Sequence, residues 1–158
     1  MNDSTKRVAI VGSGPAAFYS AMELLRHDDP MVSVDMLERL PTPYGLVRGG
    51  VAPDHEKIKS VTKIFERAAG HPRFRFFGNV EFGKDIQRLD LLQRYHAVIY
   101  AFGSRTDRHL NIIGETLKGS HAATEFVGWY NGHPDYRHHQ FDLTSKRVAI
   151  IGMGNVAI

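Results

Sequence analysis

The sequence predicts an α/β fold built on a parallel sheet. Short apolar runs at residues 6–11 and 96–103 lie between charged residues and glycine, which is typical of strands that are buried on both faces. Residues 32–38 alternate apolar and polar side chains, and a stretch with apolar residues at helical spacing separates them from the first run. Strands that alternate with helices in this way form β-α-β units and therefore a parallel sheet.

The first such unit spans residues 6–38. After the strand at 6–11 we expect a helix that begins at Pro15, because the missing N–H of proline costs nothing at the first helical position. The apolar positions of this helix are Phe18, Ala21, Met22 and Leu25. It should end near residues 27–30, and the second strand should end at Glu38.

Residues 39–53 should form an irregular loop. They include three prolines and three glycines, which fix several backbone conformations by residue type. Asp54 is then expected to cap a helix that continues to Ala68 and ends at Gly70. The apolar positions of that helix are Ile58, Val61, Ile64, Phe65 and Ala68.

The remaining elements are shorter. Aromatic residues at 74–82, interrupted by a Gly-Asn pair, predict a strand, a turn and a second strand. A short helix over 90–95 should precede the buried strand within 96–103. The polar segment 104–145 is expected to hold only a helix around 122–130.

The composition limits the chemistry that the chain can perform. Its 158 residues, 42% of them hydrophobic, suffice for one ordinary core. No cysteine is present, which excludes a disulfide framework, a thiolate-ligated iron–sulfur cluster and a redox-active dithiol. Any electron chemistry would have to belong to a bound organic cofactor. The formal charge of +3 and the pI near 9.3 suit an acidic ligand or partner, and equally a solvated surface.

The sequence shows no sign of a membrane span, a metal site or a nucleic-acid interface. No apolar run approaches the roughly 18 residues that cross a bilayer, and no signal-peptide pattern opens the chain; we expect a cytoplasmic protein without membrane insertion. His133, His138 and His139 lie in a polar loop without a second ligand pair, so no metal is expected. Trp129 and Tyr130 should pack with their helix rather than stack on bases.

A nine-residue segment occurs twice, at residues 6–14 and 146–154, with seven identical positions. The copies read KRVAIVGSG and KRVAIIGMG, and each continues as a G-x-G-x-x-A motif. A strand that passes through this motif into a helix is how a Rossmann-like unit holds a dinucleotide pyrophosphate at a helix N-terminus. Two copies therefore predict two dinucleotides.

The first copy has the context that the motif requires. Gly12 permits the tight turn, Gly14 lets the backbone approach the phosphates, and the helix N-terminus offers free N–H groups and a partial positive charge. Glu38 can accept hydrogen bonds from a ribose 2′-hydroxyl and would repel a 2′-phosphate, which favours FAD or NAD over NADP. A tight turn beside a solvated glutamate is the structural alternative. The helix opens with Pro15, Ala16 and Ala17, and Ala17 allows close packing on the strand.

Several longer blocks are spread over nearly the whole chain. They are VGSGPA at 11–16, PYGLVRGGVAPDH at 43–55, FGNVE at 77–81, FVGWYN at 126–131 and GNVA at 154–157. In this order they resemble the adrenodoxin-reductase-type ferredoxin-NADP reductases, above all the bacterial and mycobacterial members. Together the blocks are highly specific, whereas one block alone would not be.

The resemblance implies a flavoprotein in which NADPH gives a hydride to FAD, and the flavin passes single electrons to a ferredoxin or a similar small iron–sulfur protein. It implies that Ala16, Glu38, Leu46 and Val80 contact FAD and that His55 is a catalytic residue near the nicotinamide and flavin. Without the family, Leu46 and Val80 would be packing residues and His55 a surface or capping residue. A monomer is implied for the full-length protein.

Two arginines are further candidates. Arg48 and Arg108 could contact phosphate, because a guanidinium suits that geometry, and the resemblance places Arg108 at NADP; a solvated loop arginine is the alternative. Two positions depart from the family. Met153 replaces a frequent polar residue, which should weaken one contact to the second dinucleotide, and Ile113 replaces a proline, which should loosen a turn.

The second glycine motif should bind its dinucleotide less well than the first. The resemblance assigns Met153, Gly154, Asn155 and Val156 to NADP(H), but the sequence ends before a helix could follow. We expect residues 1–145 to be a FAD-binding domain that lacks its C-terminal segment, and residues 146–158 to be the first strand and glycine motif of a truncated NADP-binding domain. The chain alone should then bind FAD weakly or incompletely and transfer little or no hydride.

Other interpretations stay open. A glutamate synthase small subunit would carry two dinucleotide motifs, but it is usually preceded by cysteine-rich sequence and lacks the block at 43–55. A noncatalytic module would bind an adenine dinucleotide without reducing it. A truncated gene product could have no folded function.

Overall fold

The computed structural model describes residues 5–104, 106–154 and 156–157. The chain divides into two compact units, Met1–Ser104 and Arg105–Ile158. The first unit contains the sheet, and the second contains a single α-helix among its described residues.

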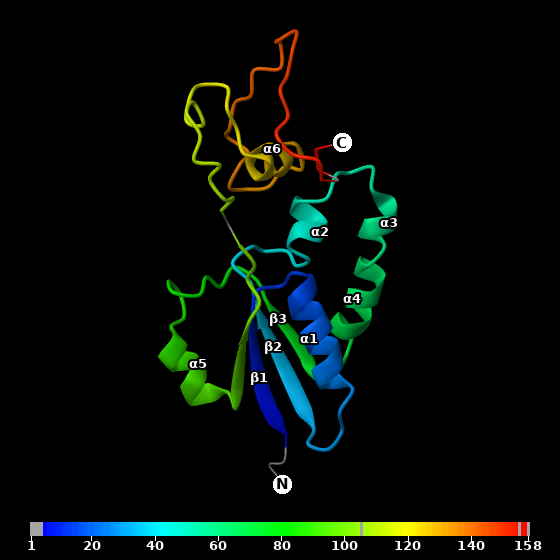
Figure 1. Cartoon of the computed structure of the whole chain (residues 1–158). Coiled ribbons are helices and arrows are strands. Elements are labelled where there is room, and N and C mark those ends of the chain that lie inside the picture. The colour runs from blue at the N-terminus through cyan, green and yellow to red at the C-terminus, as the bar shows by residue number, and fades with distance from the viewer. Residues whose placement is uncertain (1–4, 105, 155, 158) are drawn as a thin grey trace. The chain divides into compact units, whose positions relative to one another are not determined.

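The first unit is built on a four-stranded sheet in which all paired strands are parallel (Figure 1). The strands are β1 (Lys6–Val11), β2 (Val32–Leu37), β3 (Phe74–Phe77) and β4 (Ala97–Tyr100). Their order is β3-β2-β1-β4, so the order reverses between β1 and β4. The predicted parallel α/β fold is therefore confirmed, and its switch point lies where β1 ends and the glycine motif begins.

Helices cover both faces of the sheet (Figure 1). On one face lie α1 (Pro15–Leu25) and α4 (Thr62–Ala69), and Phe18 and Phe65 join the larger core cluster there. On the other face α5 (Arg88–Arg94) contributes Leu91 to a smaller cluster with Ala9, Val11 and Leu37. Alternate residues of β1 enter the two clusters, as the period of two in a strand requires.

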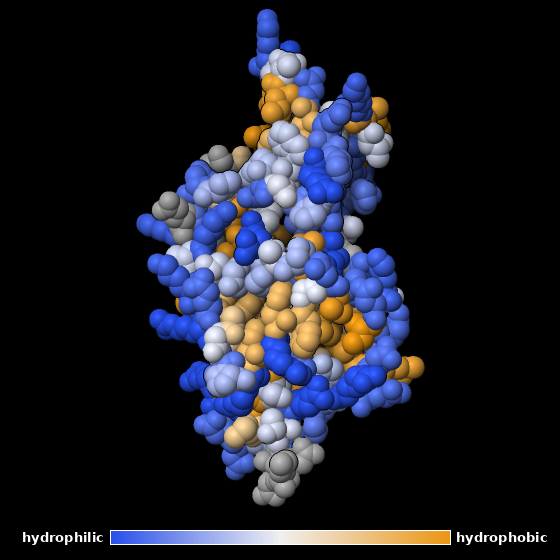
Figure 2. Space-filling model, turned by 180° about the vertical axis from the view of Figure 1, so that it is seen from behind, coloured by the Kyte–Doolittle hydropathy of each residue, from blue (hydrophilic) through white to orange (hydrophobic). Residues whose placement is uncertain are grey.

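The face beneath α5 is only partly covered. Phe77 and Tyr100 point to that face and remain 38% and 44% exposed. In the space-filling view, this unit shows an apolar surface area that is bordered by hydrophilic residues (Figure 2).

The prediction of one continuous helix from Asp54 to Ala68 is wrong. The segment forms two helices, α3 (Glu56–Lys59) and α4. At the break, the Ser60 hydroxyl donates to the carbonyl of Lys57 at 2.6 Å, and the Thr62 hydroxyl donates to the carbonyl of Lys59 at 2.9 Å. Such side-chain bonds compete with the helical backbone ladder. The preceding loop also holds one helical turn, α2 (Leu46–Gly49), that the sequence did not predict.

The second strand expected within residues 74–82 is not formed either. Asn79 has a positive φ of 58°, which turns the chain after β3. The N–H groups of Asn79 and Val80 donate instead to the carbonyls of Leu40 and Glu38, at 3.2 and 2.9 Å. The chain beyond β3 is thereby held against the end of β2, and the helix expected at 90–95 begins earlier, as α5.

The second unit has α6 (Ala123–Tyr130) as its helix, close to the predicted 122–130. Trp129 packs against Phe126 and Phe141, with ring centroids 5.8 and 5.0 Å away, in agreement with the expected packing role. Residues 147–151 form no strand, and Val148, Ile150 and Ile151 are 80%, 66% and 71% exposed. The expected strand is absent because the described residues of this unit offer no strand with which it could pair.

None of the helices that the structure describes combines the length and the apolar character needed to cross a bilayer.

Candidate dinucleotide-binding site

The first glycine motif lies at the carboxyl end of β1, between the ends of its two neighbouring strands. The N–H of Gly12 donates to the carbonyl of Leu37 at 2.8 Å, and the N–H of Ala101 donates to the carbonyl of Val11 at 2.8 Å. Gly12 has a φ of +103°, and a Cβ there would lie 2.5 Å from the Ala101 carbonyl oxygen. Only glycine fits this turn, both by conformation and by space.

The start of α1 is open to a ligand. Gly14 is its N-cap, Pro15 occupies the first turn, and neither a side-chain cap nor an acidic residue is present there. A Cβ on Gly14 would meet no atom within 4 Å, so an anion can approach the backbone at this point. Unpaired N–H groups and the helix dipole favour such an anion. Ala16 is exposed at this end, whereas Ala17 is fully buried where α1 meets the sheet.

Glu38 lies beside this turn with its carboxylate held at both oxygens. The hydroxyl of Ser13 donates to Oε2 at 2.6 Å, and the N–H of Leu40 donates to Oε1 at 3.0 Å. Ser13 is only 1% exposed. Glu38 was predicted at this site from the sequence, whereas Ser13 was missed; the only available signal was a polar residue between the two motif glycines.

A segment of the 39–53 loop packs against the glycine turn. The N–H of Tyr44 donates to the carbonyl of Ser13 at 2.9 Å, although Tyr44 has a φ of 90°. The Tyr44 ring lies 5.3 Å from that of Phe18 in the core. The neighbouring Gly45 comes so close that its Cβ would lie 3.0 Å from the Cα of Gly14. This packing explains why the loop has a defined course.

The candidates drawn from the resemblance have different positions in the first unit. Leu46 follows Gly45 and is 67% exposed. Val80 is half-buried against the smaller core cluster, and its N–H donates to the carbonyl of Glu38. Val80 is thus bonded to Glu38 through its backbone, Glu38 is bonded to the glycine turn through Ser13, and Leu46 directly follows the Gly45 that packs against Gly14.

His55 and Arg48 lie in the same part of the chain as Leu46. His55 is exposed just before α3, and its described hydrogen bonds are made by its backbone. The Nε of Arg48 donates to the carbonyl of Pro43 at 3.0 Å, and its guanidinium lies 5.4 Å from the centre of the Tyr44 ring. Arg48 therefore steadies the loop, and neither side chain is fixed against the glycine turn by these contacts.

The second glycine motif belongs to the second unit and has a different local structure. Gly152 has a φ of +143°, and no helix follows it among residues 153, 154, 156 and 157. Met153, Gly154 and Val156 are exposed, as is Arg108; Asn155 lies outside the described residues. The described part of this copy lacks both the paired strand and the helix that surround the first copy.

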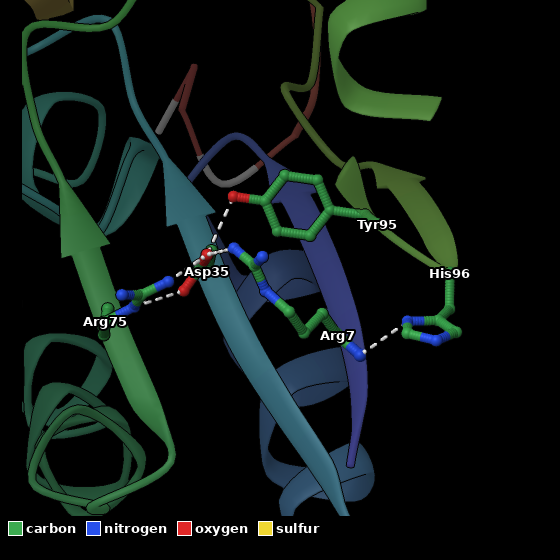
Figure 3. Close-up of polar contacts among 5 residues, drawn as sticks. All are labelled: Arg7, Asp35, Arg75, Tyr95 and His96. Carbon is green, nitrogen blue, oxygen red and sulfur yellow. Dashed lines mark hydrogen bonds and ion pairs between the residues drawn. The ribbon is translucent and has the colours of Figure 1, made fainter. Parts of the chain in front are cut away.

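A separate cluster of charged and polar side chains lies on the sheet face that α5 partly covers (Figure 3). Asp35 is 3% exposed and accepts two hydrogen bonds from Arg75, at 2.7 and 2.6 Å, and one from the Tyr95 hydroxyl at 2.7 Å. Arg7 adds a contact at 3.4 Å. Burial by itself would raise the pKa of Asp35, but these partners outweigh it and lower the pKa. Burial and the nearby carboxylate raise the pKa of Tyr95.

The described residues contain no group of three or more histidine, aspartate or glutamate side chains arranged to hold a metal ion.

Comparison with known proteins relates this geometry to a family. A profile described as pyridine nucleotide-disulphide oxidoreductase matches residues 6–158. The NADPH-ferredoxin reductase FprA of Mycobacterium leprae is 57% identical over 155 residues, which cover 96% of this chain and 34% of that protein. The mitochondrial NADPH:adrenodoxin oxidoreductase of Drosophila melanogaster is 47% identical over 154 residues, 98% of this chain and 33% of that protein.

A solved structure gives the same result at the level of the fold. Mycobacterium tuberculosis FprA in complex with NADPH matches with a TM-score of 0.93 and 57% identity, over 97% of this chain and 35% of that one. The chain thus spans about a third of the length of these relatives. With a family profile that extends from β1 to the last residue, the chain belongs to the pyridine nucleotide-disulphide oxidoreductase family.

Proposed function

We propose that this chain forms the FAD-binding part of an NADPH-dependent ferredoxin reductase. The observation that carries the proposal is the joint position of the open Gly14 turn and the Glu38 carboxylate at the switch point of a parallel sheet. Similarity to proteins named as NADPH-ferredoxin reductases supports the choice of reaction.

The residues of the first unit suit an adenine dinucleotide. The pyrophosphate would lie at the start of α1, against Gly12, Gly14 and the residues Pro15, Ala16 and Ala17. Glu38 would accept hydrogen bonds from the adenosine ribose, and Leu46 and Val80 would add apolar and backbone contacts. When bound, FAD supplies a group that accepts a hydride and releases single electrons.

The proposal gives the two glycine motifs unequal roles. Residues 1–145 would form the FAD-binding domain, and residues 146–158 would begin the NADP(H)-binding domain. His55 would be the catalytic residue near the two cofactors. The contacts to NADP(H) would be made by Arg108, Met153, Gly154, Asn155 and Val156. Because residues 147–151 are unpaired and exposed, we expect this polypeptide alone not to use NADPH productively. Ferredoxin would be the electron acceptor of the whole protein, a cytoplasmic monomer.

A visible absorption spectrum tests this function. The purified 158-residue chain, incubated with FAD and desalted, should retain a substoichiometric amount of flavin, and Glu38→Ala should retain less. Addition of NADPH without oxygen should leave the flavin oxidised. Rapid bleaching would refute the unequal roles of the two motifs, and failure to bind FAD or ADP would refute the dinucleotide site itself.

A second candidate is a noncatalytic module that binds an adenine dinucleotide without reducing it. The lack of a paired strand at residues 147–151 favours this function. The two candidates differ when the FAD-loaded chain is first reduced with one equivalent of dithionite, which the flavin consumes, and is only then mixed with an oxidised ferredoxin. A reductase should reduce the iron–sulfur protein faster than the same amount of free reduced FAD does, whereas a noncatalytic module should not.

A further inference from the structure

Ser13 links three segments that meet at the glycine turn. Its hydroxyl donates to Oε2 of Glu38 at 2.6 Å, a distance typical of a short O–H···O⁻ hydrogen bond. Its carbonyl accepts the N–H of Tyr44 at 2.9 Å. Ser13 is 1% exposed, so water does not compete strongly for its hydroxyl.

The two donors on Glu38 determine which way the carboxylate faces. The Ser13 hydroxyl occupies one acceptor position of Oε2, and the Leu40 N–H occupies one of Oε1. A carboxylate has about four lone-pair positions, so each oxygen keeps one for a ligand. A rigid pair of acceptors that remains half-exposed matches the adjacent hydroxyls of a ribose.

The backbone of Ser13 is constrained as well. It lies between Gly12, whose turn admits no Cβ, and Gly14, against which Gly45 packs. The Tyr44 N–H fixes its carbonyl, and Tyr44 is itself anchored by its ring against Phe18. The serine hydroxyl therefore reaches Glu38 from a fixed point.

From these contacts we infer that Ser13 is a positioning residue for ribose recognition. It holds the Glu38 carboxylate in the orientation that accepts the 2′-hydroxyl of an adenine nucleotide. This inference rests on the proposed dinucleotide site and adds to it a residue that acts through Glu38 without touching the ligand. A serine that only satisfied its own buried hydroxyl would stabilise the turn but would not alter the choice between ribose and deoxyribose.

The test compares ADP with 2′-deoxy-ADP on the full 158-residue chain, by calorimetric or NMR titration. Ser13→Ala should weaken ADP about fivefold to tenfold, the loss expected of one ordinary hydrogen bond. It should weaken 2′-deoxy-ADP less, because that nucleotide offers Glu38 only its 3′-hydroxyl. Glu38→Ala should abolish the preference for ADP over 2′-deoxy-ADP. In the Glu38→Ala background, Ser13→Ala should have no further effect on the ratio of the two dissociation constants.

The controls separate the possible failures. Ser20→Ala removes a hydroxyl of α1 that donates to the carbonyl of Ala16 and should leave the ratio unchanged. An equal loss of both ligands in Ser13→Ala, or an unchanged preference, would overturn the positioning role. If the parent chain bound ADP without preferring it over 2′-deoxy-ADP, this inference alone would fail. If the parent bound neither nucleotide, the proposed function would fail and this inference with it.

Discussion

The two glycines of the first motif have separate physical requirements. Gly12 needs a positive φ, and backbone atoms lie within 2.6 Å of the place that a Cβ would occupy. Gly14 instead has an extended backbone, and a Cβ there would meet no atom within 4 Å. One glycine is required by the fold and the other by the proposed ligand.

A pair of alanine substitutions should separate these roles. Gly12→Ala should destabilise the first unit by at least about 1–3 kcal/mol, because strain and a backbone clash combine. Gly14→Ala should change the free energy of unfolding by less than about 0.5 kcal/mol, yet weaken FAD and ADP strongly by blocking the pyrophosphate. Thermal denaturation and nucleotide titration measure the two effects; a stable Gly14→Ala protein with parental affinity would contradict the assigned ligand position.

Asp35 should make the stability of the first unit depend on acid pH. Its folded pKa is lowered from the ordinary value of 3.8, so its contribution is present above that value and is lost as the pH falls through the folded pKa. Asp35→Asn should cost about 1–3 kcal/mol at pH 7, because the hydrogen bonds to a charged acceptor are lost. It should also flatten the loss of stability below pH 4.

Urea denaturation across pH 2–7 measures this dependence. Asp54→Asn, which changes an exposed carboxylate, is the matched control and should behave like the parent. If the steep loss of stability at acid pH persisted in Asp35→Asn, titratable groups other than Asp35 would be responsible for it.

At the scale of elements, α5 is attached to the sheet through one fully buried residue. Leu91 is 0% exposed, whereas its neighbour Leu92 is 48% exposed. Leu91→Ala should destabilise the first unit by about 2–5 kcal/mol through lost burial and a cavity. Leu92→Ala should stay within about 0.5 kcal/mol of the parent, and equal effects in chemical denaturation would show that α5 is held differently.

The elements also show where local patterns suffice. The helix at α1 was predictable, since Pro15 and the spacing of its apolar residues act within one segment. The break between α3 and α4 was not, because the hydroxyls of Ser60 and Thr62 can point to solvent or bond back to the chain. The spacing of apolar residues does not indicate which of these two hydrogen-bonding arrangements the hydroxyls adopt.

At the scale of the whole molecule, nearly all of the buried apolar surface lies in the first unit. Of the buried hydrophobic residues in the described parts of the chain, only Val127 belongs to the second unit. Residues 1–104 expressed alone should therefore unfold cooperatively, whereas residues 105–158 alone should not, since a small chain with little core is marginal.

Circular dichroism during thermal unfolding of the two pieces measures this difference. Cooperative unfolding of residues 105–158 would show that the second unit has a sufficient core of its own. Loss of the sheet from residues 1–104 would show that the first unit requires the rest of the chain.

The parallel α/β class and the first β-α-β unit could be predicted from the amino-acid sequence, because both depend on residue type and spacing over a few turns. The same local pattern predicts that Gly12, Gly14 and Glu38 form a dinucleotide site. Only the folded chain shows that Ser13 is bonded to both Glu38 and Tyr44. It also shows that the described part of the second glycine motif has neither a paired strand nor a following helix. The physical reason is that β1 and β2 are paired in parallel, which brings the ends of two strands together across 25 residues of chain, and no local pattern reports which distant groups will meet there.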